Sequence, residues 1–305
     1  MKQSNNIILS IIIISYNTKE LLEQCINSII KSLMNSESKH QASSVSYEII
    51  VVDNNSKDDS VKFVNSLIRN KLAIKLIENK ENVGFAKANN QGIKIAKGEY
   101  IMLLNSDTIV QNNALEILVD YLEENPDIAV LGPKLLNADQ TSQPSVGNFP
   151  SLPVVANMLF FEHFVPNRFV RWSPKTTRAV DWVMGAALMS RREIFNKIGG
   201  LDENIFMYME ELEWCYRIKK NGYKIYFYPQ AKIVHLGQGS SKTGRKDPII
   251  NIYKGLIYFY RKHYPFWKTA LLKVTLKIKA GLSYLLGILT NNSYLKETYG
   301  EAFKI

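Results

Sequence analysis

The chain of 305 residues is 46% hydrophobic and carries a formal net charge of +10, and its length suits one large α/β domain with additions or two small domains. Its two cysteines lie far apart in the sequence, which argues against a disulfide framework or a zinc site and indicates a reducing compartment. The charge indicates an anionic partner, either anionic lipid or a phosphorylated ligand; we expect no nucleic acid, because no arginine-rich segment or nucleic-acid-binding motif is present.

The first part of the chain alternates apolar runs with segments of helical periodicity. The run at residues 7–14 is too short to span a bilayer and lacks a small-residue cleavage site, so we expect a buried strand, no signal peptide and a cytosolic protein. The other predicted strands are residues 47–52, 74–78, 100–104 and 128–132, and the predicted helices are residues 19–33, 58–69, 86–96 and 112–123. Successive strand–helix units predict an α/β fold with a doubly wound, parallel sheet.

Polar residues follow three of these strands. They are Ser15-Tyr16-Asn17, Asp53-Asn54-Asn55-Ser56 and Asn105-Ser106-Asp107. Open α/β sheets bind ligands at the carboxyl ends of their strands, so a site is expected there. Asp107 could hold a divalent cation that in turn holds a diphosphate, although an Asx-turn leaving the strand is the alternative. The chain has no glycine-rich dinucleotide fingerprint and no P-loop, which favours metal-held phosphate.

The pattern loosens after the fifth predicted strand. Residues 137–175 are rich in Pro, Ser and aromatic residues and show no clear period. Beyond them we predict strands at residues 180–190, 224–228 and 232–235, helices at residues 192–198 and 210–221, and helical structure from residue 249 onwards. Residues 237–246 form a basic Gly/Ser-rich segment that we expect to be flexible.

Taken together, these motifs resemble the nucleotide-sugar half of glycosyltransferase family 2, which has the GT-A fold. The segment Asn82-Val83-Gly84-Phe85-Ala86 with Asn89 adds to the strand-end motifs. The second half is similar to the rhamnosyltransferase-like branch of that family, through Asp181-Trp182-Val183-Met184-Gly185-Ala186, Gly199-Gly200-Leu201-Asp202-Glu203 and the segment from Phe206 to Arg217. The resemblance implies a GT-A domain over residues 1–247, with a nucleotide-sugar half (1–135) and an acceptor half (136–247), followed by a C-terminal helical segment (248–305).

The resemblance also implies a role for each matching residue. Asp53 would hydrogen-bond the pyrimidine base, and Asn105 would face the ribose or phosphate. Asp107 would be the metal ligand of the family's Asp-x-Asp motif, in which Asn105 replaces the first carboxylate, and Mg²⁺ or Mn²⁺ is the implied cofactor. The donor-binding residues would be Ser15, Tyr16, Asp53, Asn55, Asn82, Gly84, Asn89, Asn105, Ser106 and Asp107.

Glu210-Glu211-Leu212-Glu213 stands where the family usually shows Glu-Asp-x-Asp, which places the catalytic base on Glu211 with Glu210 beside it. An inverting glycosyl transfer needs a base for the acceptor hydroxyl, and clustered carboxylates can raise one another's pKa. The alternative is that these glutamates only favour a helix N-terminus. The acceptor-binding residues would be Asp181, Trp182, Gly185 and Glu210. A Trp in an apolar strand is as often a core residue.

His235 ends the last predicted strand. In related enzymes a His at this distance after the base reaches the metal or the diphosphate, so His235 is a second candidate metal ligand; a structural hydrogen-bonding role is the alternative. Lys242, Arg245 and Lys246 lie in the basic loop that follows. This loop could close over the diphosphate or remain a solvated surface loop.

Residues 266–289 are the other informative stretch. Apolar residues recur there at spacings of three and four, and lysines lie off that stripe. The stripe is Leu271, Val274, Ile278, Leu282, Leu285 and Leu289, and the lysines are Lys268, Lys273, Lys277 and Lys279. This pattern indicates a basic amphipathic helix on a membrane surface, and the alternative is a helix packed on the protein's own core.

The resemblance implies an inverting hexosyltransferase of bacterial cell-surface polysaccharide synthesis, peripheral on the inner face of the plasma membrane. The branch favours dTDP-L-rhamnose as the nucleotide diphosphate sugar donor and a polyprenyl-diphosphate-linked saccharide or another glycan as acceptor. Two alternatives stay open: a UDP-hexose or UDP-galactofuranose donor, and a catalytically idle nucleotide-sugar-binding scaffold. A homodimer is also left open.

Overall fold

The computed structural model describes residues 7–34, 46–161, 169–237 and 246–305. In these residues the central sheet has nine strands. They are β1 (Leu9–Ser15), β2 (Tyr47–Asp53), β3 (Ile74–Glu78), β4 (Tyr100–Asn105), β5 (Thr108–Val110), β6 (Ile128–Leu136), β9 (Arg178–Ala179), β11 (Ala187–Arg191) and β12 (Lys224–His235). The strand order is β3-β2-β1-β4-β11-β6-β12-β5, with β9 paired to β12 beside this path.

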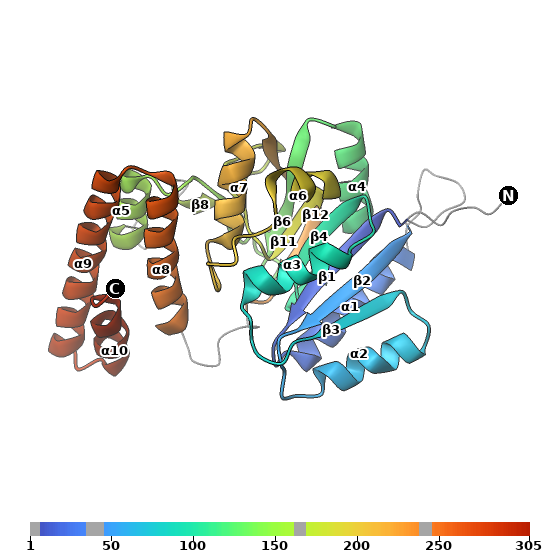
Figure 1. Cartoon of the computed structure of the whole chain (residues 1–305), viewed down its shortest axis with the longest axis horizontal. Coiled ribbons are helices and arrows are strands. Elements are labelled where there is room, and N and C mark those ends of the chain that lie inside the picture. Colours follow the sequence, from blue (N-terminus) through green and yellow to red (C-terminus); the bar gives the residue numbers. More distant parts are fainter. Residues whose placement is uncertain (1–6, 35–45, 162–168, 238–245) are drawn as a thin grey trace.

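The predicted α/β fold is confirmed, and the sheet is mixed rather than wholly parallel. The strands β3, β2, β1 and β4 run parallel, as do β6 and β12. The strand β11 lies antiparallel between β4 and β6, and β5 pairs antiparallel with the end of β12. Because β1, β2 and β4 run in one direction, their carboxyl ends meet at one edge of the sheet (Figure 1). These strands end at the predicted donor residues Ser15, Asp53 and Asn105.

Helices cover both faces of the sheet. They are α1 (Lys19–Met34), α2 (Ser60–Arg69), α3 (Phe85–Ile95), α4 (Ala114–Glu124), α6 (Arg192–Ile198) and α7 (Glu210–Lys220). Alternate side chains of β1 enter different cores: Ile11 and Ile13 pack with α1 and α4, whereas Ile12 and Ile14 join the core that holds α3, α6 and α7. Every residue of β1 is buried, Ser10 included, as the apolar character of the run predicted.

Residues 180–190 do not form the single strand that their apolar character predicted. They form β10 (Trp182–Val183) and, after a turn, β11 of the main sheet. The strand β10 belongs to a small second sheet with β7 (Val146–Gly147) and β8 (Arg171–Trp172). A sequence pattern does not reveal this change of sheet, because both halves of the segment are equally buried.

Residues 224–235 form one strand where two were predicted. The two expected short strands are one strand, β12, with a register shift against β6 between Tyr228 and Lys232. Pro229 lies in this irregular part of the strand and has no N–H to donate to the ladder. The irregularity interrupts the pairing without ending the strand.

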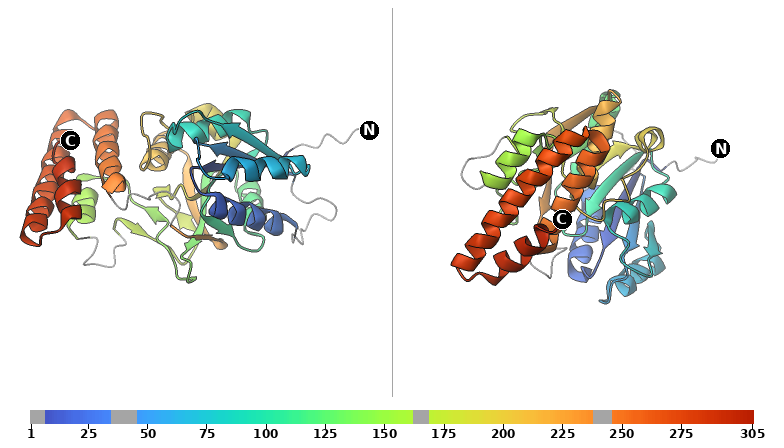
Figure 2. Two further views of the ribbon diagram at one scale, coloured as in Figure 1. Left: turned by 90° about the horizontal axis from the view of Figure 1, so that it is seen from below. Right: turned by 60° about the vertical axis from the view of Figure 1, so that its left-hand side comes forward.

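Four helices form a group beside the sheet. They are α5 (Leu152–Phe160), α8 (Lys246–His263), α9 (Phe266–Leu289) and α10 (Ser293–Ala302). Figures 1 and 2 show them packed together at one end of the molecule, and α9 contacts the other three. Residues 152–160 show no clear hydrophobic period, so the place of α5 in this group was not expected. Within the described residues, no helix combines the length and apolar character that spanning a bilayer requires.

The helix α9 has two different apolar faces. One packs on the protein and is built from mostly small or medium side chains, namely Thr269, Leu272, Leu276, Ala280, Ser283 and Gly287. The predicted stripe lies on the other face and is exposed, from 48% at Leu271 to 75% at Leu289. Packing on the protein is therefore confirmed for one face, and binding of the exposed face to a membrane stays a prediction.

Candidate active site

The end of β2 holds a buried carboxylate with one unused oxygen. Asp53 is 2% exposed, and its Oδ1 accepts a hydrogen bond of 2.9 Å from the backbone N–H of Ser56. Its Oδ2 is buried and has no hydrogen-bond partner. The backbone on either side is fixed, because Asn54 donates its N–H to the Ser15 carbonyl and Asn79 donates to the Asp53 carbonyl. This free, buried oxygen can accept a hydrogen bond from a ligand.

The turn before α3 lies beside this carboxylate. Gly84 has a φ of +88°, and a Cβ atom there would lie 2.8 Å from the Phe206 ring, so only glycine fits. Gly84 donates its N–H to Asn82 Oδ1 over 3.0 Å, and Asn54 Nδ2 donates to the same oxygen over 3.3 Å. The next residue, Phe85, donates its N–H to the Phe206 carbonyl. The turn is thereby held between the end of β2 and the loop that leads to α7.

The remaining predicted donor residues differ in exposure and in hydrogen bonding. Tyr16 is 44% exposed, whereas Asn89 is buried and its amide donates to the Phe85 carbonyl within α3. Asn55 has a φ of +67° and accepts a hydrogen bond from Lys57. Ser15 Oγ lies 3.3 Å from Thr18 Oγ1, and Ser106 is 7% exposed.

Asn105 and Asp107 meet His235 where β5 pairs with β12. Asn105 Oδ1 is buried without a hydrogen-bond partner. The register places Thr108 opposite His235, and His235 Nε2 lies 3.4 Å from Asp107 Oδ1. A hydrogen bond of 2.9 Å from Leu236 N to the Asp107 carbonyl closes this pairing. An amide oxygen, a carboxylate and an imidazole therefore gather at the end of the sheet.

The ring of His235 is oriented by Gln143. The Gln143 amide nitrogen donates to the Asn137 side chain and to the His235 carbonyl, so its oxygen faces His235 Nδ1 at 2.8 Å. That oxygen requires an N–H at Nδ1, which leaves Nε2 directed at Asp107. In the described residues no group of three His, Cys, Asp or Glu side chains could hold a metal ion. A divalent cation here would rely on one carboxylate, with further ligands from an amide, an imidazole, water and phosphate, a set that suits Mg²⁺ or Mn²⁺.

Two residues in the left-handed region precede α7. Tyr208 has a φ of +67° and Met209 a φ of +82°. Non-glycine residues rarely adopt this conformation, and consecutive examples are typical of functional sites. The backbone N–H of Glu213 donates to the Met209 carbonyl, which starts the helix directly after the turn. The turn fixes where the first glutamates of α7 point.

Those glutamates, Glu210 and Glu211, each have a buried carboxylate oxygen without a hydrogen-bond partner, although Glu211 as a residue is only half-buried. Glu210 is 4% exposed, and the Oε2 atoms of both side chains are buried without a partner. Burial, together with the negative charge of Glu211, raises the pKa of Glu210 well above its usual value. Burial also raises the pKa of Glu211, although backbone N–H donors, including Gly185 at 3.3 Å, and the charge of Arg171 oppose the rise.

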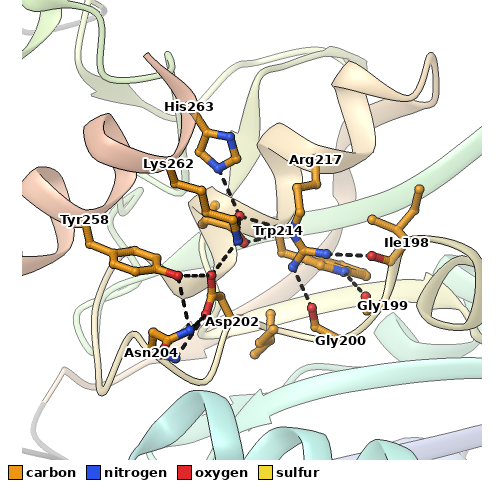
Figure 3. A network of polar contacts seen from close by, with 12 residues as sticks. Ile198, Gly199, Gly200, Asp202, Asn204, Trp214, Arg217, Tyr258, Lys262 and His263 are labelled. Carbon is orange, nitrogen blue, oxygen red and sulfur yellow. Dashed lines mark hydrogen bonds and ion pairs between the residues drawn. The ribbon is translucent and has the colours of Figure 1, made fainter. Parts of the chain in front are cut away.

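Glu213, in the same helical turn, has the opposite environment. Figure 3 shows three partners of its carboxylate, Arg217, Lys262 and His263. This glutamate is fully buried and meets Arg217 Nε at 2.9 Å, Lys262 Nζ at 2.8 Å and His263 Nε2 at 3.0 Å. Lys262 also contacts Asp202 at 2.5 Å. Burial by itself would raise the pKa of Glu213, but its hydrogen bonds and positive neighbours outweigh burial and lower it. This network attaches α8 to α7.

A cavity of about 600 Å³ connects the catalytic candidates with the helical group. The sequence-predicted residues in its lining are Asn105, Asp107, Trp182, Gly185, Glu210, Glu211 and His235. The other predicted donor residues lie outside this lining. Residues of α5, α8, α9 and α10 complete it, and sequence reasoning missed all of them. Of these four helices only α5 was not predicted, although Ser151 and Pro153 are typical of a helix start.

Two predicted acceptor residues have structural contacts of their own. Asp181 lies outside the cavity lining; it accepts a hydrogen bond from Phe149 N and forms an ion pair of 2.6 Å with Lys219. Trp182 is 7% exposed and donates its Nε1–H to the Asn148 carbonyl, so it is a core residue that also reaches the cavity. Lys242 and Arg245, predicted to close over the diphosphate, lie outside the described residues, as does the Lys246 side chain.

Comparison with known proteins gives four informative matches. A sequence model described as "Glycosyl transferase family 2" matches residues 10–199. The chain is 27% identical over 254 residues to N-acetylglucosaminyl-diphospho-decaprenol L-rhamnosyltransferase of Mycobacterium tuberculosis, covering 75% of this chain and 79% of that protein. Among solved structures, the mannosyltransferase PcManGT of Pyrobaculum calidifontis in complex with GDP-Man and Mn²⁺ has a TM-score of 0.56 and 17% identity, over 97% of this chain and 85% of that one. GalNAc-T7 with UDP, GalNAc and Mn²⁺ has a TM-score of 0.57 and 19% identity, over 85% and 50%.

Proposed function

Because the chain belongs to glycosyl transferase family 2 and is a hexosyltransferase with the GT-A fold, we propose that it transfers L-rhamnose, with inversion, from dTDP-L-rhamnose to a polyprenyl-diphosphate-linked saccharide. The name of the mycobacterial relative joins L-rhamnose to a diphospho-decaprenol-linked sugar, which supports both the donor and the acceptor class. The observation that carries the proposal is the pair of buried carboxylates, Glu210 and Glu211, in one cavity with Asn105, Asp107 and His235.

Glu211 is the better placed base of the two carboxylates. The pKa of Glu210 is raised further, by burial and by the charge of Glu211, so Glu210 holds its proton more firmly. Backbone N–H donors and Arg171 favour the charged form of Glu211. As the acceptor oxygen attacks the anomeric carbon, its proton passes to Glu211 and the bond from that carbon to the diphosphate breaks. Glu210, still protonated, can donate a hydrogen bond to the saccharide.

Asp53 is proposed to select the nucleotide base. Its unpartnered Oδ2 is an acceptor in a buried place, and a thymine or uracil ring offers an imino N–H donor. The Asn82–Gly84 turn is hydrogen-bonded to the neighbouring Asn54, so its backbone lies close enough to contribute to the same nucleotide site. Tyr16, 44% exposed at the same edge, offers a ring for stacking on the base.

Asn105, Asp107 and His235 are proposed to hold Mg²⁺ or Mn²⁺. The unpartnered Asn105 Oδ1 and the short approach of His235 Nε2 to Asp107 fit a cation between them. A bound cation would neutralise charge that develops on the departing diphosphate. Both solved structures of the same fold contain Mn²⁺, in keeping with this assignment.

The exposed stripe of α9 is proposed to attach the protein to the inner face of the plasma membrane. The stripe is apolar, and Lys268, Lys273 and Lys277 lie along the same helix, where they can meet anionic lipid. Each lysine near such a surface contributes about 1 kcal/mol, and salt screens the attraction. Co-sedimentation with anionic vesicles, weakening as salt is added, tests this attachment.

The donor is tested with a panel of nucleotide sugars. The protein is incubated with dTDP-L-rhamnose, UDP-glucose or UDP-galactofuranose together with a polyprenyl-diphosphate-linked saccharide, and the product and melting temperature are measured. We expect transfer from dTDP-L-rhamnose and a raised melting temperature with that donor, because a ligand that binds only the folded state stabilises it. Transfer from a UDP sugar instead would replace the proposed donor. Binding without transfer or hydrolysis of any donor would favour an idle scaffold.

A further inference from the structure

The cavity has an apolar end that sugar transfer does not require. Its wall there comes from α5 and α8, helices that lie outside the sheet (Figure 1). The apolar side chains are Val154, Val155, Met158 and Leu159 of α5 and Ile249, Ile252 and Leu256 of α8. Saccharides present hydroxyl groups that need hydrogen-bond partners, so a wall of this kind suits hydrocarbon rather than sugar.

A lysine without an anionic partner lines the same end. Lys279 comes from α9, and its ammonium lies 5.8 Å from the centre of the Phe160 ring at the end of α5. No hydrogen bond or ion pair joins it to another described residue, and burial lowers its pKa. A half-buried ammonium beside apolar groups is costly unless an anion accompanies it. An anionic ligand in the cavity would supply that charge.

Tyr253 adds a hydrogen-bond donor to this end. The residue is 3% exposed, and its hydroxyl is buried without a hydrogen-bond partner although it lines the cavity. Buried hydroxyls are nearly always hydrogen-bonded, so an unused one beside a cavity points to a ligand. One ammonium and one hydroxyl among hydrocarbon side chains form a place for an anionic group that carries an apolar tail.

We propose that the apolar end of the cavity binds the lipid end of the acceptor. Lys279 and Tyr253 contact its diphosphate, and the side chains of α5 and α8 contact its first prenyl units. The saccharide then extends toward Glu211 in the same cavity. This inference rests on the proposed function, from which it takes the lipid-linked acceptor. Lys279 therefore has a different proposed role from the other lysines of α9. The outer face of that helix carries the exposed stripe, whereas Lys279 lines the cavity.

The direct test is calorimetric binding of a short prenyl diphosphate, with the donor site saturated by dTDP so that the diphosphate cannot bind there. The full chain is compared with Lys279→Gln and with Lys254→Gln, a matched control at an exposed lysine of α8. We expect Lys279→Gln to weaken binding about 10-fold or more, because a charge-assisted hydrogen bond is lost. Lys254→Gln should bind as the natural chain does, and Lys279→Arg should keep most of the affinity.

Inorganic diphosphate should bind far more weakly than the prenyl compound, because it makes no apolar contacts. The proposal is overturned if inorganic diphosphate binds equally well, or if Lys279→Gln and Lys254→Gln have the same affinity. With transfer assays, Lys279→Gln should raise KM more for the lipid-linked saccharide than for the same saccharide without lipid, and an equal rise would also contradict the proposal. Prenyl diphosphate binding without sugar transfer would sink the proposed function alone, whereas transfer with no difference between the lysine variants would sink this inference alone.

Discussion

The first turn of α7 holds glutamates in two opposite kinds of environment. Glu213 meets Arg217, Lys262 and His263, and its carboxylate is fully buried among them. Glu210 and Glu211 each keep an oxygen that is buried without a partner. Burial alone does not tell a structural glutamate from a functional one here. The difference is whether every carboxylate oxygen has a hydrogen-bond or ion-pair partner. A satisfied group holds the fold together, and an unsatisfied one is available to a ligand.

The pKa values of these carboxyls follow the same division. That of Glu213 lies below its usual value, whereas those of Glu210 and Glu211 lie above it. A lowered pKa stabilises the fold above the ordinary carboxyl value, and this stability is lost as the pH falls through the lowered value. A raised pKa stabilises the fold at low pH only, and this stability is lost as the pH rises through the raised value. The two kinds of glutamate therefore predict different responses to substitution.

The largest expected effect is the loss of stability when the Glu213 carboxylate is removed. Glu213→Ala leaves Lys262, Arg217 and His263 together without their shared anion, so the free energy of unfolding should fall by about 3–5 kcal/mol. Chemical denaturation measures this loss. Glu193→Ala is the matched control, since Glu193 is an exposed glutamate paired with Lys197 and should change stability by less than about 1 kcal/mol. Equal effects of the two substitutions would refute the division.

A second test removes the carboxylate proposed to hold the cation. Asp107→Ala should lower the transfer rate about 10²-fold or more, because a bound cation contributes several kcal/mol to the transition state. It should also abolish the rise in melting temperature that Mn²⁺ produces in the presence of a nucleoside diphosphate. Full activity of the natural chain in excess EDTA would contradict the metal assignment.

A third, smaller effect is expected at the other unsatisfied carboxylate, Asp53. Asp53→Ala should weaken binding of the donor and of the free nucleoside diphosphate alike, by about 10-fold, because both make the same hydrogen bond to Oδ2. Calorimetry with both ligands measures the two affinities. Unchanged nucleotide affinity would remove Asp53 from the site.

The smallest effect should be a gain in stability. At neutral pH the raised pKa of Glu210 costs stability, so Glu210→Gln should raise the free energy of unfolding by about 1 kcal/mol. Denaturation at several pH values should show the gain above the ordinary carboxyl pKa and its disappearance at lower pH. A loss of stability at neutral pH would mean that the Glu210 carboxylate stabilises the fold, as that of Glu213 does, and is not kept for a ligand.

The sequence predicted the nucleotide-sugar half better than the rest of the molecule. Its strands β1, β2 and β4 are largely apolar and lie parallel, so Asp53, Asn105 and Asp107 could be placed at one edge from their positions at strand ends. The structure brings His235 Nε2 to 3.4 Å from Asp107 Oδ1, and the role of His235 as a metal ligand stays a prediction. His235 ends β12 and Asp107 lies between β4 and β5, and the antiparallel pairing of β5 with β12 that brings them together was not predicted.

What the sequence could not show depends on contacts between distant segments. Glu213 and its partners Lys262 and His263 lie about fifty residues apart, and no local pattern links them. The insertion of β11 between β4 and β6 and the place of α5 beside α9 likewise follow from tertiary packing. Asp181 matched a family motif, but its ion pair with Lys219 holds it outside the cavity lining, so its predicted acceptor role remains a prediction.

The central claim is that Glu211 is the base, and one substitution tests it most directly. Glu211→Gln keeps the shape of the side chain and removes its ability to take a proton. We expect the transfer rate to fall about 10²-fold or more, with donor affinity and melting temperature close to those of the natural chain. A rate within a few-fold of the natural chain, or a large loss at Glu210→Gln and none at Glu211→Gln, would contradict the account.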